Sequence, residues 1–285
     1  MNYRHIFHAG NICDVVKHIL LVLCLDHLRS KEKAFCVLDT HGGCGLYDLN
    51  DQRSLKTQEA QKGIYKLLLA NPLPQLSSYY KILQVLNPSY SLNDPTSIRS
   101  FHAYPGSPMV SHHKLRPQDR LIACELHPED STILRHTLRN STQAHIHCRD
   151  GYEALQAFLP PQEKRGLVLI DPPYEKTDEF DKLPALLSKA YKRFPQGLFL
   201  VWYPIKDRPA LWRFHEALIA TGIPKQLCAE FIFNDEIDQT RLNGSGCILI
   251  NPPWTFTDDL PILFKDLHRA FETTYTGINI NWLVT

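Results

Sequence analysis

The sequence predicts an α/β fold in which helices cover both faces of a sheet, and two observations indicate it. The first is a series of short apolar runs that end in acidic or glycine residues, at 36–39, 121–125, 144–151 and 167–171. The second is the alternation of these runs with segments whose apolar residues recur at helical spacing. Strands that alternate with helices in this way are typical of α/β proteins.

The helices and strands follow from the same spacing. Residues 11–30 are expected to form the first helix, because Val15, Ile19 and Leu23 recur on one face. After residue 101 the alternation is regular. The expected helices lie at 128–140, 151–159, 179–192 and 207–221, and the further strands lie at 197–203, 227–233 and 246–251.

One segment interrupts the alternation. Residues 48–100 contain two expected helices, at 57–70 and 76–86, with proline-containing breaks after them. The predicted organisation is therefore a tail, helix and first strand at 1–47, an inserted helical subdomain at 48–100, and the rest of the main domain at 101–285. The chain has 285 residues, 44% of them hydrophobic, which allows one large domain with an insertion.

The turn after the strand at 167–170 carries the most specific chemistry. Asp171 can accept one N–H of an exocyclic amine, and the carbonyl of Pro172 can accept the other because proline makes the turn stiff. Tyr174 can stack on a base, which contributes about 1–3 kcal/mol. A strand followed by an ordinary proline turn is the alternative. The apolar strand before it and the aromatic residue after it favour a site for a planar base turned out of its helix.

A glycine-rich turn at 41–45 indicates a nucleotide-like cofactor, because glycine lets the backbone approach a ligand closely. Its spacing is not G-x-G-x-x-G, and the next strand that ends in an acid lies much further along than the roughly 20 residues of a dinucleotide site. A hydride-transfer enzyme is therefore disfavoured. Glu125 could bind the hydroxyls of a ribose, and Asp150 before Gly151 could bind an adenine amine.

These features resemble the class I S-adenosylmethionine methyltransferases that act on amino groups. More narrowly, the chain resembles the bacterial RlmJ family, which methylates the N6 of an adenine in large-subunit (23S) ribosomal RNA. The resemblance covers nearly the whole chain, and its N-terminal string is the most specific part. The strings that carry it are YRHIFHAGN at 3–11, DVVKH at 14–18, LDTH at 38–41, YPGSP at 104–108, ELHP at 125–128 and VWYP at 201–204.

The resemblance implies a Rossmann-like class I methyltransferase sheet, a helical insertion, and S-adenosylmethionine as the cofactor. It implies substrate RNA contacts by Tyr3 and Arg4, and a catalytic turn at Asp171, Pro172 and Tyr174. The cofactor-binding residues that it implies are Lys17, His18, His41, Ser107, Glu125, Asp150, Gly151 and Asp171. Of these, Lys17, His18 and Ser107 rest on the resemblance alone.

Composition constrains the partners and the compartment. No apolar run reaches the roughly 20 residues that span a bilayer, and the polar start resembles no secretory signal. The 8 cysteines include no C-x-x-C pair and are expected to be reduced thiols in a cytoplasmic protein, with a monomer as the default state. Because the net charge is only +1, any basic patch for ribosomal RNA must be local. Candidates are Arg4 with His5 and His8, and the stretch 111–116 with Arg120.

Two further patterns are expected to be structural. The histidine pairs 112–113 and 145/147 lack a cysteine or carboxylate at ligand spacing, and methyl transfer from a sulfonium needs no Lewis acid, so no metal is expected. The string NPPW at 251–254 also resembles an amino-methyltransferase turn. The catalytic turn should follow the fourth strand, however, and residue 251 falls at the end of what is expected to be the last strand.

Three other functions remain open from the residues. A DNA adenine methyltransferase would use the same chemistry, although no target-recognition domain is evident. A guanine-N2 methyltransferase could hold its amine in the same turn. A non-catalytic RNA-binding protein on a methyltransferase fold would be expected to have lost Asp171 or Tyr174, and both are present.

Overall fold

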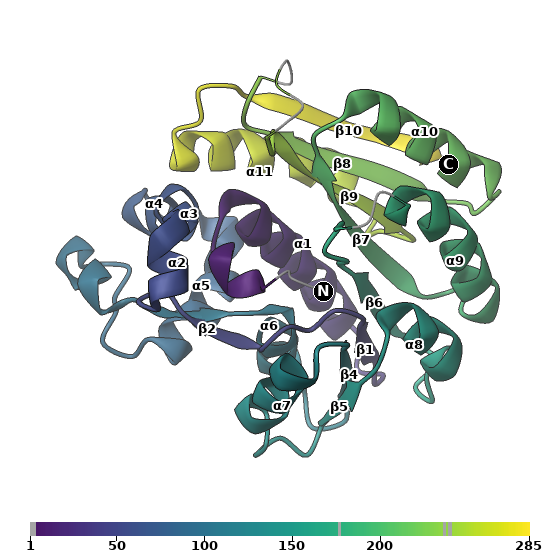
Figure 1. The fold of residues 1–285 in the computed structure, drawn as a ribbon, viewed down its shortest axis with the longest axis horizontal. Helices are drawn as coiled ribbons and strands as arrows, with labels where there is room; N and C mark the ends of the chain where they lie inside the picture. The colour runs from purple at the N-terminus through teal and green to yellow at the C-terminus, as the bar shows by residue number, and fades with distance from the viewer. Residues whose placement is uncertain (1–3, 176–177, 236–237, 239–240) are drawn as a thin grey trace.

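An eight-stranded sheet forms the centre of the protein, in the strand order β10-β8-β9-β7-β6-β1-β4-β5. The structure is a computed structural model, and it describes residues 4–175, 178–235, 238 and 241–285. Figure 1 shows the ribbon with the sheet running through the middle of the molecule. The strands of the sheet are β1 (Cys36–Asp39), β4 (Arg120–Glu125), β5 (Ala144–Cys148), β6 (Gly166–Ile170), β7 (Leu198–Ile205), β8 (Gln226–Ile232), β9 (Gly244–Ile250) and β10 (Gly277–Val284).

The direction of the strands decides where the site lies. Strands β5, β4, β1, β6 and β7 are parallel, whereas β9, β8 and β10 add antiparallel pairs beyond β7. β6 is buried along its whole length, as expected for a strand covered on both faces. The carboxyl ends of the five parallel strands therefore meet at one edge of the sheet, where ligands of open α/β sheets bind.

Helices cover both faces of the sheet, so the predicted fold class is confirmed. Successive strand residues point to opposite faces: Val37 packs into one hydrophobic core and Leu38 into the other. The first core includes α1, α6, α7 and α11, and the second includes α8, α9 and α10 (Figure 1). The bounds of these helices are α1 (Ile12–Arg29), α6 (Ser107–Lys114), α7 (Pro128–Thr137), α8 (Gly151–Phe158), α9 (Glu179–Arg193), α10 (Arg208–Ala220) and α11 (Phe256–Phe271).

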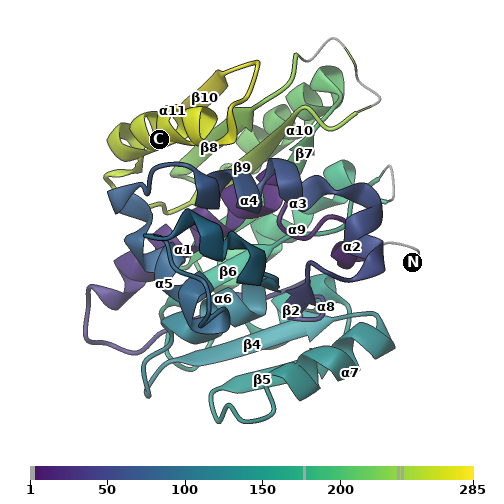
Figure 2. The ribbon, with the colours of Figure 1, turned by 90° about the vertical axis from the view of Figure 1, so that its left-hand side faces the viewer.

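Helix α1 lies between the sheet and the helices of the insertion, and Figure 2 looks onto the insertion with α1 behind it. The side chain of Asn11 caps the helix by accepting a hydrogen bond from the backbone N–H of Asp14. Leu20, Leu21 and Val22 are all buried, because the helix packs on both sides. This position brings the first turns of α1 to the carboxyl edge of the sheet.

The insertion is closed at its base by a two-stranded ribbon. β2 (Leu46–Asp48) pairs antiparallel with β3 (Ala103–Pro105), and the segment between them is largely helical. Its α-helices are α2 (Gln52–Thr57), α3 (Glu59–Lys62), α4 (Ile64–Leu69) and α5 (Ser77–Leu86). Their buried side chains share a core with α1. The description of 48–100 as a separate subdomain stays a prediction.

The single helix expected at 57–70 is wrong, because two positions break it. Gln58 has a positive φ of 54°, and Gly63 separates α3 from α4. A Cβ at Gly63 would lie 2.1 Å from the carbonyl oxygen of Gly10, so glycine is needed for this close approach. The backbone N–H of Ile64 then donates to the same carbonyl at 2.8 Å.

The other expected elements are found within a few residues of their predicted bounds. The helices and strands that were not expected include β2, α2, β3, α6, α11 and β10. Strand β9 is therefore not the last strand, because β10 follows it and pairs with β8 at the edge of the sheet. Within the described residues, no helix combines the length and the apolar character needed to cross a membrane.

Candidate functional site

A cavity of about 930 Å³ opens at the carboxyl edge of the parallel strands. Its size suits a nucleotide-like ligand together with a base. Every catalytic and cofactor-binding residue named from the sequence lines it, from Lys17 and His18 on α1 to Tyr174 after β6. The others are His41, Ser107, Glu125, Asp150, Gly151, Asp171 and Pro172.

The glycine-rich turn after β1 is fastened to the end of β4. The backbone N–H of Gly43 donates to Glu125 Oε2 at 2.8 Å, and that of His127 donates to Glu125 Oε1 at 2.7 Å. Gly43 has a φ of +58°, and a Cβ there would lie 2.1 Å from the hydroxyl of Tyr47. Both the left-handed backbone conformation and the lack of room for a side chain therefore favour glycine at this position. Each oxygen of Glu125 keeps a lone pair with which it can accept a hydroxyl.

Asp150 and Gly151 bring α8 against the same turn. Asp150 Oδ1 caps the helix by accepting from the backbone N–H of Tyr152 at 2.7 Å. A Cβ on Gly151 would lie 2.2 Å from the carbonyl oxygen of Thr40, so this glycine allows the helix to contact the end of β1. Burial lowers the pKa of His41 to about 4, and its neutral ring meets the ring of Tyr152 edge-on.

Asp171 forms an ion pair with a buried lysine. Lys17 Nζ lies 2.5 Å from Asp171 Oδ2 and 2.8 Å from Asp14 Oδ1. Burial works against the charged ammonium, but Asp14 and Asp171 outweigh it and raise the pKa of Lys17. Asp171 Oδ1 has no hydrogen-bond partner within the described residues. One oxygen of Asp171 is therefore held and the other can accept an N–H.

Tyr174 belongs to an aromatic wall beside Asp171. Its φ is +50°, and its hydroxyl donates to the carbonyl oxygen of Trp202 at 2.7 Å. Its ring centroid lies 4.9 Å from that of Phe180 and 5.8 Å from that of Trp202, and all three residues line the cavity. No hydrogen bond reaches the Pro172 carbonyl from the part of the chain that the structure describes. This corner of the cavity therefore offers acceptors for an amine beside rings that can stack on a base.

Sequence reasoning did not single out two buried acids at this site. Asp14 pairs with Lys17, and its Oδ2 lies 3.1 Å from Nε2 of His5. Asp39 is fully buried at the end of β1, and its Oδ2 has no hydrogen-bond partner among the described residues. The signal for Asp39 was present, because it ends a strand as Glu125 does.

We expect Asp39 to make the stability of the ligand-free protein depend on pH. Burial raises the pKa of Asp39 to about 7 from 3.8, although the nearby hydroxyl of Ser107 opposes the shift. The folded state therefore holds more protons than the unfolded state between these values, and the free energy of unfolding falls as the pH rises through them, by up to about 1.4 kcal/mol per pH unit.

The Asp39→Asn variant should lose this contribution. Urea unfolding at pH 5, 6, 7 and 8 would show a flatter dependence for the variant, which should be the more stable protein at pH 8. Parallel pH profiles for the two proteins would contradict the assignment.

The N-terminal segment lines the cavity but presents no free positive charge among its described residues. Arg4 lies 2.5 Å from both Glu129 and Asp130 of α7. His8 Nδ1 lies 3.0 Å from Glu59, and His5 faces Asp14. The expectation of a basic patch at Arg4, His5 and His8 is therefore wrong for the described residues. An RNA contact by Arg4 stays a prediction, and Tyr3 lies outside the described residues.

The second expected basic stretch is neutralised in the same way. Its three cations, Lys114, Arg116 and Arg120, each pair with a carboxylate, so the stretch presents no unpaired cluster. The pairs are Lys114 with Asp26, Arg116 with Asp119 and Arg120 with Glu163.

Comparisons with known proteins identify the family. The family model described as "Ribosomal RNA large subunit methyltransferase D, RlmJ" matches residues 32–284. A Haemophilus influenzae protein named Ribosomal RNA large subunit methyltransferase J is 39% identical over 285 residues, which is 99% of each chain. The chain belongs to the RlmJ family.

Two further comparisons agree in length and fold. An Escherichia coli protein of the same name is 36% identical and covers 100% of this chain and 99% of its own. A crystal structure of a Legionella pneumophila protein, 34% identical, superposes with a TM-score of 0.86 over 96% of this chain and 98% of that one. The Rossmann-like methyltransferase fold implied by the resemblance is thus confirmed.

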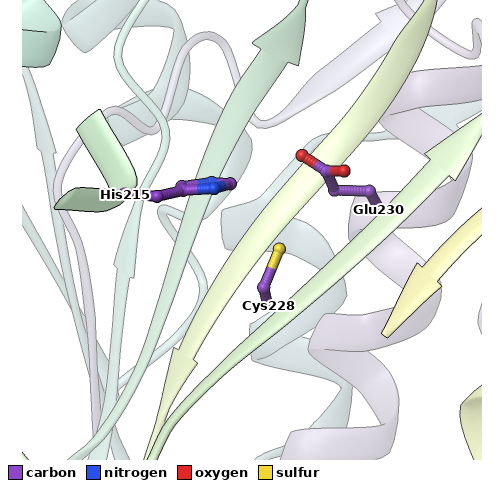
Figure 3. Close-up of side chains that lie close together, drawn as sticks. All are labelled: His215, Cys228 and Glu230. Atoms are coloured by element: carbon purple, nitrogen blue, oxygen red, sulfur yellow. The ribbon is translucent and has the colours of Figure 1, made fainter. Parts of the chain in front are cut away.

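A separate buried cluster in this RlmJ-family chain has the composition of a metal site. His215 of α10 and Cys228 and Glu230 of β8 point toward one another, with ligand atoms within 4.8 Å (Figure 3). Arg208 already neutralises Glu230 at 2.9 Å, and Tyr203 donates to it at 3.0 Å. Burial raises the pKa of Cys228 to about 12, so the thiol keeps its proton. These contacts describe a hydrogen-bonded core network.

The histidine pairs noted in the sequence lie elsewhere. His112 and His113 are adjacent on α6 with ring centroids 5.9 Å apart, and His145 and His147 share one face of β5. Across the described ranges, neither pair belongs to a group of three close histidine, cysteine or carboxylate side chains.

The second amino-methyltransferase-like turn lies at the opposite edge of the sheet. β9 is antiparallel to β7, and Ile250 pairs with Phe199 near the start of β7. Asn251 donates from Nδ2 to the carbonyl oxygens of Pro195 and Gly197, at 2.9 and 2.8 Å. Asn251 therefore closes a turn far from the end of β6. This position supports the prediction that residues 251–254 have a structural role.

Proposed function

We propose that this chain transfers a methyl group from S-adenosylmethionine to the N6 amine of an adenine in large-subunit (23S) ribosomal RNA. One observation carries the proposal: in a chain of the RlmJ family, the turn at Asp171 and the glycine-rich turn at 41–45 line one cavity. The first turn has the groups that hold an amine, and the second has those that hold a nucleotide-like cofactor.

The cofactor fits the side of the cavity formed by β1, β4 and β5. When bound, S-adenosylmethionine supplies an electrophilic methyl group on a positively charged sulfur. Glu125 would accept from the ribose hydroxyls and Asp150 from the adenine amine, while the glycines let the backbone approach closely. Asp39, with its unpartnered oxygen, lies beneath this side near Ser107. Lys17 and His18 close the cavity from α1.

The target amine fits beside Asp171. Asp171 Oδ1 would accept one N–H and the Pro172 carbonyl the other, which draws the nitrogen lone pair out of conjugation and aims it across the cavity. Tyr174 would stack on the base, supported by Phe180 and Trp202. Alignment of this kind supplies about 7–11 kcal/mol in well-oriented reactions. Asp171 can then take the proton from the methylated nitrogen, while Lys17 keeps Oδ2 in place.

The proposal also covers the compartment, the oligomeric state and the partner of the protein. The protein acts in the cytoplasm as a monomer, with ribosomal RNA as its partner and without a metal. The chemistry supports the last point, because a sulfonium that loses its methyl group departs as a neutral thioether and needs no Lewis acid.

The test is methyl transfer from labelled S-adenosylmethionine to protein-free large-subunit ribosomal RNA, with duplex DNA and assembled subunits assayed in parallel. We expect N6-methyladenosine in the RNA after nucleoside analysis. Label in DNA alone would indicate a DNA methyltransferase, and N2-methylguanosine would indicate a guanine enzyme. Cofactor binding without transfer to any nucleic acid would contradict the proposed substrate.

A further inference from the structure

Two cations on one wall of the cavity have no acidic partner among the described residues. Lys206 follows β7 directly, and Arg213 lies in the second turn of α10. Both side chains are exposed, and both line the cavity that contains Asp171. Within the described part of the chain, neither side chain makes a hydrogen bond or an ion pair. They are therefore available to an anion from outside.

The neighbouring cations differ in this respect. Lys17 is held between two carboxylates, and Lys182, which also lines the cavity, lies 2.5 Å from Asp178. Arg208 lies between Lys206 and Arg213 in the sequence and forms an ion pair with the buried Glu230. Among the described residues, Lys206 and Arg213 therefore differ from the other cations around the cavity in having no partner.

Lys206 and Arg213 line the same cavity from the end of β7 and from α10. Ala210 and Arg213 are three residues apart within α10, which places them on one helical face, and Lys206 precedes the N-cap residue Asp207. All three line the cavity, and the small side chain of Ala210 between the two cations leaves room for a ligand. We call the surface formed by Lys206, Ala210 and Arg213 the basic wall.

The basic wall continues the surface that would hold the base. In the parallel pairing of β6 with β7, Ile170 is opposite Val201, so Asp171 and Trp202 are at the same level. Lys206 comes four residues later, which is about 13 Å further out at roughly 3.3 Å per residue. This separation is comparable to that between the amino group of an adenine and the backbone phosphates near it.

The charges around the cavity are segregated. The side that fits the cofactor carries Glu125 and Asp150, which suit a cationic ligand and repel phosphate. On the other side, Asp207 caps α10, Glu179 accepts the hydroxyl hydrogen of Tyr152, and Glu175 also has an interaction partner. A polyanion that places a base beside Asp171 therefore meets unpaired positive charge in one direction, along the basic wall.

We infer that Lys206 and Arg213 bind the phosphates of the RNA strand that flank the target adenine, and so position that nucleotide with its base in the cavity. The inference rests on the proposed function and names the part of the chain that holds the RNA backbone. Lysine offers phosphate a point charge and arginine a planar pair of donors. Such contacts fix the position of the strand and carry no sequence information.

The test compares RNA binding and methyl transfer by the wild-type chain with those of the variant Lys206→Ala/Arg213→Ala. We expect the KM for protein-free large-subunit ribosomal RNA to rise roughly tenfold for each phosphate that is left without its cation. The dissociation constant for S-adenosylmethionine should stay within twofold, because neither residue is on the cofactor side. The slope of log K for RNA against log salt should become shallower by about 0.7–0.9 for each of these phosphates.

A matched control removes the same charge elsewhere. Lys192 on α9 and Lys265 on α11 are exposed and line no part of the cavity, so Lys192→Ala/Lys265→Ala should keep the wild-type KM and salt slope. The conservative variant Lys206→Arg/Arg213→Lys should keep most of the RNA affinity. An equal loss in the control pair would indicate a general charge effect and overturn the inference.

The outcomes separate the inference from the proposed function. If the wild-type chain methylates no RNA, the proposed function fails. If it methylates RNA and the Lys206→Ala/Arg213→Ala variant has an unchanged KM and salt slope, the inference fails while the function stands. Circular dichroism and the melting temperature of each variant would show that a change in KM does not come from unfolding.

Discussion

Replacing Asp171 with asparagine is expected to lower kcat for methyl transfer by about 10²–10⁴-fold. The amide oxygen of asparagine can still accept from Lys17, but its NH2 group then faces the substrate amine and donates where an acceptor is required. The Asp171→Ala variant, which has neither acceptor, should lose as much activity. Single-turnover methyl transfer at saturating RNA and cofactor measures the effect on the chemical step.

The fold should survive the change at Asp171. Asp14 still pairs with Lys17 at 2.8 Å, so the cluster keeps one anion for one cation. We expect S-adenosylmethionine to bind within tenfold of the wild-type affinity. Asn251→Ala is the matched control, because the turn at 251–254 resembles the catalytic turn in sequence but lies at the opposite edge of the sheet. Substantial turnover by Asp171→Ala, or an equal loss in Asn251→Ala, would overturn the assigned role.

Replacing Lys17 with methionine is expected to lower the free energy of unfolding by about 3–5 kcal/mol. The side chain of Lys17 is 5% exposed, and its removal would leave Asp14 and Asp171 as neighbouring carboxylates without their shared cation. Natural domains have only about 5–15 kcal/mol of stability, so the variant should unfold at a much lower urea concentration. Activity should fall as well, since Asp171 would no longer be held.

Two variants separate this effect from a simple loss of a lysine. Lys182→Met removes a cavity-lining but exposed lysine and should leave the urea midpoint unchanged. Lys17→Met/Asp171→Asn removes one anion together with the cation, so it should be more stable than Lys17→Met alone. A double variant that loses the sum of the two single effects would show that the pair is not coupled.

The part of the site that follows strand ends could be predicted from the sequence. Asp171, Glu125 and Asp150 each come directly after or at the end of an apolar run, and parallel strands bring such positions to one edge. The structure adds what spacing cannot show. Asp14 is brought to Asp171 by the packing of α1 against the sheet, and the pairing of Arg4 with α7 depends on contacts between residues distant in sequence.

The missed elements have physical reasons of their own. Pro184 and Pro261 lie inside α9 and α11, so proline did not end either helix, and α11 was passed over. β10 is an edge strand in which no residue is fully buried, and such a strand gives a weak apolar signal. The break in the helix expected at 57–70 depends on Gly63 meeting Gly10, a contact that no local propensity reveals.

The position of α1 sets the order in which a newly synthesised chain can complete its site. Lys17 leaves the ribosome early, but its partner Asp171 is 154 residues further along, and Cys13 at the start of the same helix donates to the carbonyl of Gly244, 231 residues away. Contacts between residues so distant in sequence form slowly, because a long loop must close first. The nascent protein therefore cannot form the ion pair between Lys17 and Asp171 before β6 is made. The contact of α1 with β9 forms only when synthesis is nearly finished.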